Sequence, residues 1–477
     1  MQEIELIQKI EEILKLRSET KNIELKKGAG GTNKVYDALS AFSNTEGGII
    51  IFGIDEDNDF TLTNVYDVQD LQTKICEQCK EMEPEVRPVI TPINYKGCDL
   101  VSVEVPEIDY SLKPCYHKAK GQRKGSYIRI GNANEPMSEY EIYSYDAFKR
   151  QICDDIRKIE RALNKKIDTT KLDVYLAQLK QNRPNLASAS IQDLLELNSF
   201  FVDNTPTLIY VLMFSIYPQA ILPNLCAHAV VVPGLQVGEV TESGARFIDN
   251  KKIEGTLTEI IEESIGFVRK NMSHQTVINS ITGQRTDVPE YPIAAIREAI
   301  LNAVVHRDYS FHTENMPIQI NMFTDRIEIT NPGGLYGRLT VDDLGKIQPD
   351  TRNPNIAKAL ELLKVTENRY SGIPTIKKSM REANLPDPVF INERGCFKVI
   401  LYNSKNVEER RSADPIKAVL DFCIEPRTLA EIQNYLGFKS LSYVRNNFVK
   451  PLIENGRLLY TIPDKPGSKY QKYKTKR

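Results

Sequence analysis

Three carboxylates near the start of the chain have residue types and a spacing that suit metal chemistry. Glu19 and Glu24 lie five residues apart around one extended segment, and Asp55 ends the apolar strand expected at residues 49–54. If these strands are neighbours, the three side chains converge at one edge of a sheet. Carboxylate oxygens suit Mg²⁺ or Mn²⁺, and a held metal activates water against a phosphodiester. The alternative is that they are solvated acids at strand ends, the usual place for Asp and Glu.

A second group of residues combines cations with aromatic rings in the segment 113–131. Tyr116 and Tyr127 are interleaved with five cations, a combination that suits a nucleic-acid backbone together with base stacking. A surface hairpin with a solvated basic tip would show the same pattern of residue types, so both interpretations stay open. The cations are Lys118, Lys120, Arg123, Lys124 and Arg129.

A third pair of residues belongs to the helix expected at 292–306. Glu298 and Asn302 are four residues apart and therefore share one face of that helix. In a nucleotide pocket, the Asn oxygen can ligate Mg²⁺ and the Glu can orient or deprotonate water. From the helix alone, an exposed polar face is the alternative.

The C-terminal segment 413–477 is locally basic, with 12 Lys and Arg against 6 Asp and Glu. Its pattern predicts three helices and then a strand, an order that resembles a winged helix-turn-helix. Such a domain can grip DNA or another protein, and both interpretations stay open. Residue types that suit phosphates or base edges occur in the third helix and the tail. They are Lys439, Ser442, Tyr443, Arg445, Lys469, Lys472 and Lys474.

The elements that position these residues form a modular chain of α/β and α+β type. Apolar strands alternate with amphipathic helices, and no internal repeat is present. We expect an N-terminal domain, a charged helical connector, an α/β domain, a linker and a C-terminal helical domain. The boundaries are 1–150, 151–185, 186–405, 406–412 and 413–477.

Composition limits the class of protein. The 477 residues carry 62 Lys and Arg and 64 Asp and Glu, so any nucleic-acid binding has to come from local patches. No apolar run reaches the roughly 20 residues that a membrane helix needs. Eight scattered cysteines predict a reducing compartment, and we expect a cytoplasmic protein. Cys76 and Cys79 form a lone CxxC, which is insufficient for zinc.

The N-terminal 130 residues resemble a known family. The segments ETKNIELKKG, ALSAFSNTEGGIIIFGIDED and KPCYHKAKGQRKGSYIRIGN are similar to the Schlafen-type AlbA-like domain, which is described as a DNA-binding domain. In nuclease-active Schlafen proteins an E-x-x-x-x-E pair and a later Asp form the metal site. Glu19, Glu24 and Asp55 match that pattern, which implies a second divalent metal at these carboxylates. The resemblance implies nucleic-acid contact more strongly than cleavage.

Residues 200–402 resemble a second family, the GHKL-type ATPase domain, in its branch catalogued as helicase-like. The matching segments are REAILNAVVHRDY, FTDRIEITNPGGL, RNPNIAKALELL and ENRYSGIPTI. A P-loop is absent from the sequence, so a P-loop helicase is excluded. The resemblance implies ATP and Mg²⁺ as cofactors, and GHKL domains commonly dimerise, so we expect a homo-oligomer.

The GHKL resemblance also assigns roles to residues. It places Asn302 on Mg²⁺ and makes Glu298 the base for an ATP-directed water. Gly333 and Gly334 would approach adenine, and Ser371 and Gly372 would cover phosphate. GHKL enzymes usually carry an adenine-reading Asp where this chain has Asn331. Asn can offer an amide oxygen to the adenine amino group, but without charge.

Together these features predict an ATP-responsive, DNA-binding transcription regulator, with DNA favoured over RNA. The first alternative is a metal-dependent nuclease, in phage defence, that the GHKL-like domain gates. The second alternative is an interaction scaffold with a degenerate nucleotide site, motivated by Asn331.

Overall fold

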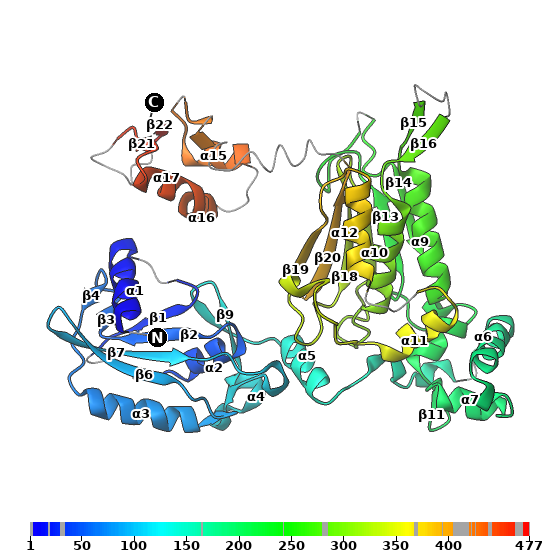
Figure 1. Ribbon diagram of the computed structural model, residues 1–477, viewed down its shortest axis with the longest axis horizontal. Coiled ribbons are helices and arrows are strands. Elements are labelled where there is room, and N and C mark those ends of the chain that lie inside the picture. The colour runs from blue at the N-terminus through cyan, green and yellow to red at the C-terminus, as the bar shows by residue number, and fades with distance from the viewer. Residues whose placement is uncertain are drawn as a thin grey trace.

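The structure is a computed structural model, and it confirms the mixed α/β multidomain class (Figure 1). No helix among the described residues combines the length and apolar character of a membrane span. The described residues are 3–17, 20–28, 34–163, 166–241, 243–278, 285–366, 371–393, 395–403, 419–420, 422–424, 426–436, 441–462 and 471–476.

The N-terminal domain is a four-stranded sheet with helices on both faces (Figure 1). Alternation along β2 explains the two layers, since Ile49 and Ile51 pack toward α1 while Ile50 and Phe52 pack toward α2. β1 runs parallel to β2, and the other pairs are antiparallel. In spatial order the strands are β1 (Ile23–Lys26), β2 (Gly48–Phe52), β7 (Cys98–Val105) and β6 (Val89–Tyr95), and the helices are α1 (Glu3–Leu16), α2 (Tyr36–Asn44) and α3 (Val68–Lys80).

Short elements complete this domain around the basic segment. They end in α5, which starts with a capping box at Ser138 and Glu141. The elements are β3 (Ile54–Asp55), β4 (Thr61–Leu62), β5 (Met82–Glu83), η1 (Tyr110–Leu112), β8 (Tyr116–His117), η2 (Lys118–Lys120), α4 (Gly121–Gly125), β9 (Tyr127–Ile130), β10 (Ala133–Pro136) and α5 (Glu139–Lys149).

The connector differs from the continuous helix expected there. Two 3₁₀ turns precede its α-helix, because Asp154 and Asp155 are buried and bound to other parts of the chain. Its elements, and those that follow up to the second sheet, are η3 (Asp154–Ile156), η4 (Glu160–Ala162), α6 (Thr169–Asn182), η5 (Pro184–Leu186), α7 (Ile191–Leu197), β11 (Phe201–Val202), β12 (Thr205–Pro206), α8 (Leu208–Phe214) and η6 (Pro218–Ala220).

The second domain is a six-stranded mixed sheet covered by helices (Figure 1). α10 lies between α9 and α12 and packs on β18, so its inward face is almost wholly apolar. In spatial order the strands are β14 (Asp249–Ile253), β13 (Ala227–Val231), β17 (Ile318–Met322), β18 (Arg326–Pro332), β20 (Cys396–Tyr402) and β19 (Val389–Glu393). The remaining elements are α9 (Leu257–Asn271), α10 (Ile293–Val305), η7 (Val341–Asp343), α11 (Pro354–Leu362), α12 (Gly372–Glu382) and the hairpin of β15 (His274–Ile278) and β16 (Arg285–Pro289).

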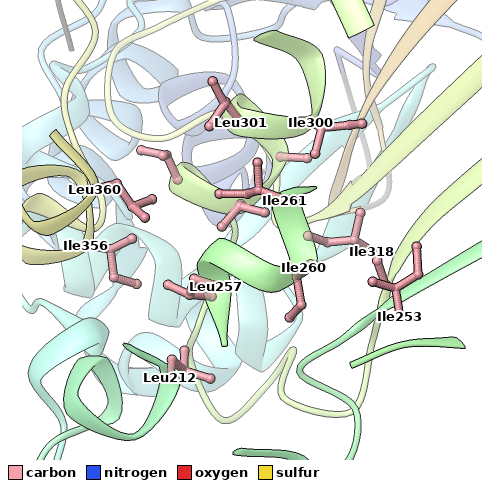
Figure 2. Packing of buried hydrophobic residues seen from close by; sticks show 14 of the residues in the cluster. Leu212, Ile253, Leu257, Ile260, Ile261, Ile300, Leu301, Ile318, Ile356 and Leu360 are labelled. Carbon is pink, nitrogen blue, oxygen red and sulfur yellow. The ribbon is translucent and has the colours of Figure 1, made fainter. Parts of the chain in front are cut away.

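The largest core of the molecule belongs to this second domain. Figure 2 shows aliphatic side chains from α9, α10 and α11 meeting under the sheet, among them Leu257, Ile261, Ile300 and Leu360. All four side chains are buried. This core fixes α10 against the sheet, and with it the face that carries Glu298 and Asn302.

The C-terminal segment has its own small core around Val419, Ile432 and Leu458. The described elements keep the predicted order of helices followed by a strand, and a second strand completes a hairpin. The domain boundaries and the winged-helix type remain predictions. The elements are α15 (Leu429–Leu436), α16 (Leu441–Val444), η8 (Arg445–Val449), α17 (Lys450–Glu454), β21 (Leu458–Tyr460) and β22 (Tyr473–Thr475).

Candidate functional site

A cavity of about 370 Å³ lies beside α10, at the start of α12. Its volume falls in the range of small-molecule sites. Glu298, Asn302, Ser371 and Gly372 all line it, so the structure brings these four predicted residues together. A second cavity of about 100 Å³ adjoins it, and Asn302 is among the residues that line both.

The first turn of α12 lies against the polar face of α10. A Cβ atom built on Gly372 would be 2.3 Å from Glu298 Oε1 and 2.9 Å from Asn302 Nδ2. An added Cβ atom would therefore force the ends of these two side chains to shift. Asn302 Nδ2 is buried and has no hydrogen-bond partner among the described residues. The N-terminus of a helix is also where backbone N–H groups favour an anion.

The smaller cavity is apolar and lies between α10 and the sheet. Ala299 and Ala303 line it from the helix, and their short side chains leave room above Ile329, Phe397 and Val399. Gly334 also lines this cavity. An apolar slot of this kind suits the ring of a base.

Asn331 is the polar residue at the sheet side of this slot. Alternation along β18 places it on the same face as the core residues Ile327 and Ile329. It is 4% exposed, and its Oδ1 has no hydrogen-bond partner among the described residues. A buried polar atom without a partner is unusual, and a role in binding a ligand explains it well.

Gly333 has a different position from the one predicted. Its φ of +97° requires glycine, and an added Cβ would lie 2.5 Å from both Asp308 and Arg352. Gly333 therefore packs behind the slot, whereas Gly334 faces it. Gly333 supports the turn, and it is not among the residues that line the slot.

A buried ion pair lies behind this glycine turn. Arg352 and Asp308 are 2.9 Å apart, and the Tyr140 hydroxyl donates to Asp308 Oδ2 at 2.8 Å. Burial alone would raise the pKa of Asp308, but Arg352 and the hydrogen bonds from Ser310 and Tyr140 lower it below its ordinary value. The carboxylate is therefore ionised at pH 7.

His306 ends α10 and lines both cavities. Burial, together with the positive charge of Arg352, lowers the pKa of His306 to about 4. The imidazole is consequently neutral at pH 7, and it can offer one donor and one acceptor to a ligand.

Helix α5 contacts the loop that walls the slot. The Phe148 ring meets Tyr336 edge-on at 5.5 Å, and the Arg338 guanidinium lies 5.9 Å from the centre of the Phe148 ring. Tyr336 itself lines the slot. Together with Tyr140, these contacts connect the end of the N-terminal domain to the region of the two cavities.

Sequence reasoning missed the contributions of Tyr140, Tyr336 and Arg352. Each depends on a partner far away in the chain, such as Tyr140 with Asp308, so local spacing contains no indication of it. The GHKL resemblance pointed to this region through Gly333 and Gly334, and a Cβ atom added to either glycine would meet another side chain.

The N-terminal carboxylates do not come together as predicted among the described residues. Glu24 is buried, and its two oxygens pair with Lys26 at 2.7 Å and Arg129 at 3.0 Å. Asp55 lies 3.2 Å from Lys27 instead. No group of three potential metal ligands occurs in the described part of the chain. Glu19 lies outside the described residues, so the metal site stays a prediction.

The basic segment divides into exposed and buried cations. Arg129 was predicted to contact nucleic acid, and this prediction is wrong, because its side chain is 2% exposed and bound to Glu24. Lys118, Lys120 and Arg123 lie at the surface, where each has an acidic neighbour. Lys124 is exposed and in the same turn.

The C-terminal candidates lie only partly among the described residues. Arg445, Lys472 and Lys474 are exposed. Lys439 and Lys469 lie outside the described residues, as do the side chains of Ser442 and Tyr443.

Three family models match the chain. Residues 19–138 match "Schlafen, AlbA_2", and residues 315–401 match "Putative ATP-dependent DNA helicase recG C-terminal". The chain carries a Schlafen AlbA_2 domain and a RecG-type C-terminal ATPase domain. Both domains are of the kinds found in nucleic-acid-binding, ATP-using proteins. Residues 414–475 match "Filamentation induced by cAMP protein Fic-like, C-terminal domain".

Solved structures give weaker likenesses. The DIP2311 protein from Corynebacterium diphtheriae is 18% identical, over 95% of this chain and 92% of that one, with a TM-score of 0.38. The N-terminal domain of a "Putative ATP-dependent DNA Helicase RecG-related Protein" from Nitrosomonas europaea is 27% identical, over 27% of this chain and 90% of that one, with a TM-score of 0.23. A Fic family protein from Desulfovibrio desulfuricans G20 is 11% identical, over 52% and 61%, with a TM-score of 0.13. No curated protein matches the chain.

Proposed function

We propose that this protein binds ATP with Mg²⁺ in the cavity beside α10 and that the bound nucleotide controls its grip on DNA, as in a transcription regulator. The observation that carries the proposal is a pair of buried amide atoms, Asn302 Nδ2 and Asn331 Oδ1, that have no hydrogen-bond partner among the described residues. Both residues line the two adjoining cavities. Such atoms are stabilised when a ligand supplies hydrogen bonds to them.

We assign one end of the cavity to each part of the nucleotide on the basis of the residues that line it. The base would lie in the apolar slot against Asn331, and the phosphates would lie near Gly372 at the start of α12. The Asn302 amide is the protein group that would hold Mg²⁺, which usually keeps several waters and phosphate oxygens as its other ligands. Mg²⁺ supplies charge neutralisation for the phosphates. Glu298 is suited to orient or deprotonate a water beside them.

Helix α5 provides a physical route from this cavity to the AlbA_2 domain. Its Tyr140 is bonded to Asp308, and its Phe148 packs on Tyr336 in the wall of the slot. A base that occupies the slot contacts Tyr336 directly. Nucleotide binding that moves this wall also changes the contacts of α5, and coupling of two sites needs such a shared element.

Nucleic acid would contact the exposed cations of both outer regions. In the AlbA_2 domain these surround Lys120 and Lys124, and in the C-terminal region they include Arg445, Lys472 and Lys474. Phosphate contacts of this kind give affinity without sequence specificity. We favour duplex DNA over RNA as the target.

The test is a titration of labelled duplex DNA, single-stranded DNA and RNA with the full chain, with and without ATP and Mg²⁺. We expect duplex DNA to bind, and ATP to change its affinity. Replacing Lys472 and Lys474 by Ala should flatten the log–log salt dependence by about 0.9 for each phosphate that the variant no longer neutralises. An unchanged slope removes these two lysines from the proposal, and no ATP binding at millimolar concentration leaves an interaction scaffold.

A further inference from the structure

Asn331 lies at the bottom of the apolar slot. Its side chain is an amide, and a carboxylate of the same size would also fit there. Asn331 is 4% exposed, and β18 directs its side chain to the helix-covered face of the sheet. The register places Phe397 beside it on β20, and both residues line the slot. A ring held between the Ala299 and Ala303 methyl groups and this sheet would present its edge to the Asn331 amide.

Few groups around the Asn331 amide can form a hydrogen bond with it. Oδ1 has no hydrogen-bond partner among the described residues, and the residues around it in the slot are mainly apolar. A polar group buried in this way favours a ligand that completes its hydrogen bonds, and it disfavours a ligand edge that cannot. The chemistry of the amide therefore decides which base edge is accepted.

An amide and a carboxylate read a purine edge differently. An ionised carboxylate only accepts hydrogen bonds, so it pairs with the amino group of adenine and repels the carbonyl oxygen of guanine. The Asn amide has both an acceptor and a donor, and a half-turn about its last side-chain bond exchanges them. It can accept from the adenine amino group or donate to the guanine oxygen.

A second residue of the same cavity can accept hydrogen bonds. Asp350 lines the slot, and its carboxylate is an acceptor. Guanine carries a ring N–H and an amino group next to its oxygen, whereas adenine has neither donor at those positions. The lining therefore includes an amide, Asn331, and a carboxylate, Asp350, and the carboxylate would suit the guanine donors.

We propose that Asn331 makes this site accept both adenine and guanine nucleoside triphosphates, with Asn331 as the residue that sets base selection. The proposal rests on the nucleotide binding proposed above and goes further by naming the ligand class. A pyrimidine nucleotide held by its phosphates is shorter and leaves the amide without a partner.

The test is calorimetric titration of the full chain with Mg²⁺ and the β,γ-imido analogues of ATP and GTP, and with CTP. It is done at pH 8, so that a carboxylate introduced at position 331 is ionised. We expect the two purine analogues to bind within tenfold of each other and CTP to bind more weakly than either. A preference of more than tenfold for one purine analogue, or CTP binding equal to both, overturns the proposal. If no nucleotide binds, the proposed function itself fails, which is a different outcome.

The isosteric variant Asn331→Asp identifies the residue responsible. We expect it to keep the affinity for the ATP analogue and to weaken the GTP analogue at least tenfold. The matched control is Asn250→Asp, the same change at an exposed position on edge strand β14, which should alter neither. An unchanged ratio in Asn331→Asp overturns the proposal. If that variant does not fold, Asn331→Ala should weaken both purine analogues in parallel, and weakening of one alone refutes the inference.

Discussion

Replacing Gly372 by Ala tests the close approach of α12 to α10. The new Cβ atom would lie 2.3 Å from Glu298 Oε1, whereas ordinary contacts begin at 3.4 Å. The carboxylate therefore has to move by about 1 Å, a displacement that can cost about a hundredfold in a positioned reaction. We expect at least a tenfold loss of ATP affinity and a larger loss of any ATP hydrolysis.

The same variant should fold, because Ala has a higher helix propensity than Gly by up to about 1 kcal/mol. The matched control is Gly266→Ala on α9, where an added Cβ meets nothing within 4 Å. That control should keep the ATP affinity and gain roughly 0.5–1 kcal/mol of stability. Calorimetric titration with ATP and Mg²⁺, together with thermal melting, measures both quantities. If Gly372→Ala binds ATP as well as the unaltered protein does, the reasoning about this approach is refuted.

Three further predictions concern Tyr140, Glu24 and His228. Tyr140→Phe removes a hydrogen bond to a buried carboxylate at the domain junction. We expect the effect of ATP on DNA affinity, measured by fluorescence anisotropy, to become at least threefold smaller. An unchanged ATP effect contradicts the route through α5. Glu24→Gln leaves the buried Arg129 without its anion and should cost about 3 kcal/mol of stability in denaturant unfolding. The control Glu46→Gln, at an exposed ion pair, should cost less than about 1 kcal/mol. Equal losses would refute the structural role of Glu24. Burial and a neighbouring lysine lower the pKa of His228 below 6.5. The unfolded chain therefore binds the proton first, and stability is lost as the pH falls below 6.5. His228→Gln should make the melting temperature less dependent on pH in this range, and an equal dependence would argue against this role of His228.

Much of the architecture follows from periodicity. The helix expected at 292–306 is α10, because its apolar residues recur on one face and that face packs on a sheet. The apolar run at 49–54 supplies β2, which is buried on both faces. The GHKL resemblance, rather than periodicity, pointed to Gly334 and Gly372, and both glycines line the cavities.

Other features could not be predicted because they depend on distant partners. Arg129 has the composition of a surface cation, yet Glu24, on a strand 105 residues earlier, draws it into the interior. The charged connector has a helical pattern, yet its first part forms short turns, where the buried Asp155 accepts hydrogen bonds from Asn355 and Ile356, 200 residues later. In each case a long-range ion pair or hydrogen bond outweighs the local preference of the chain.

Asp155 determines where the ATPase domain can be separated from the rest of the chain. This fully buried side chain accepts hydrogen bonds from the backbone N–H groups of Asn355 at 2.8 Å and Ile356 at 3.1 Å, in the first turn of α11. A fragment that begins after residue 155 would leave these two groups unbonded in the interior. Proteolytic removal of the AlbA_2 domain should therefore yield a stable remnant only when the cut lies ahead of Asp154. The connector then remains part of the ATPase fragment.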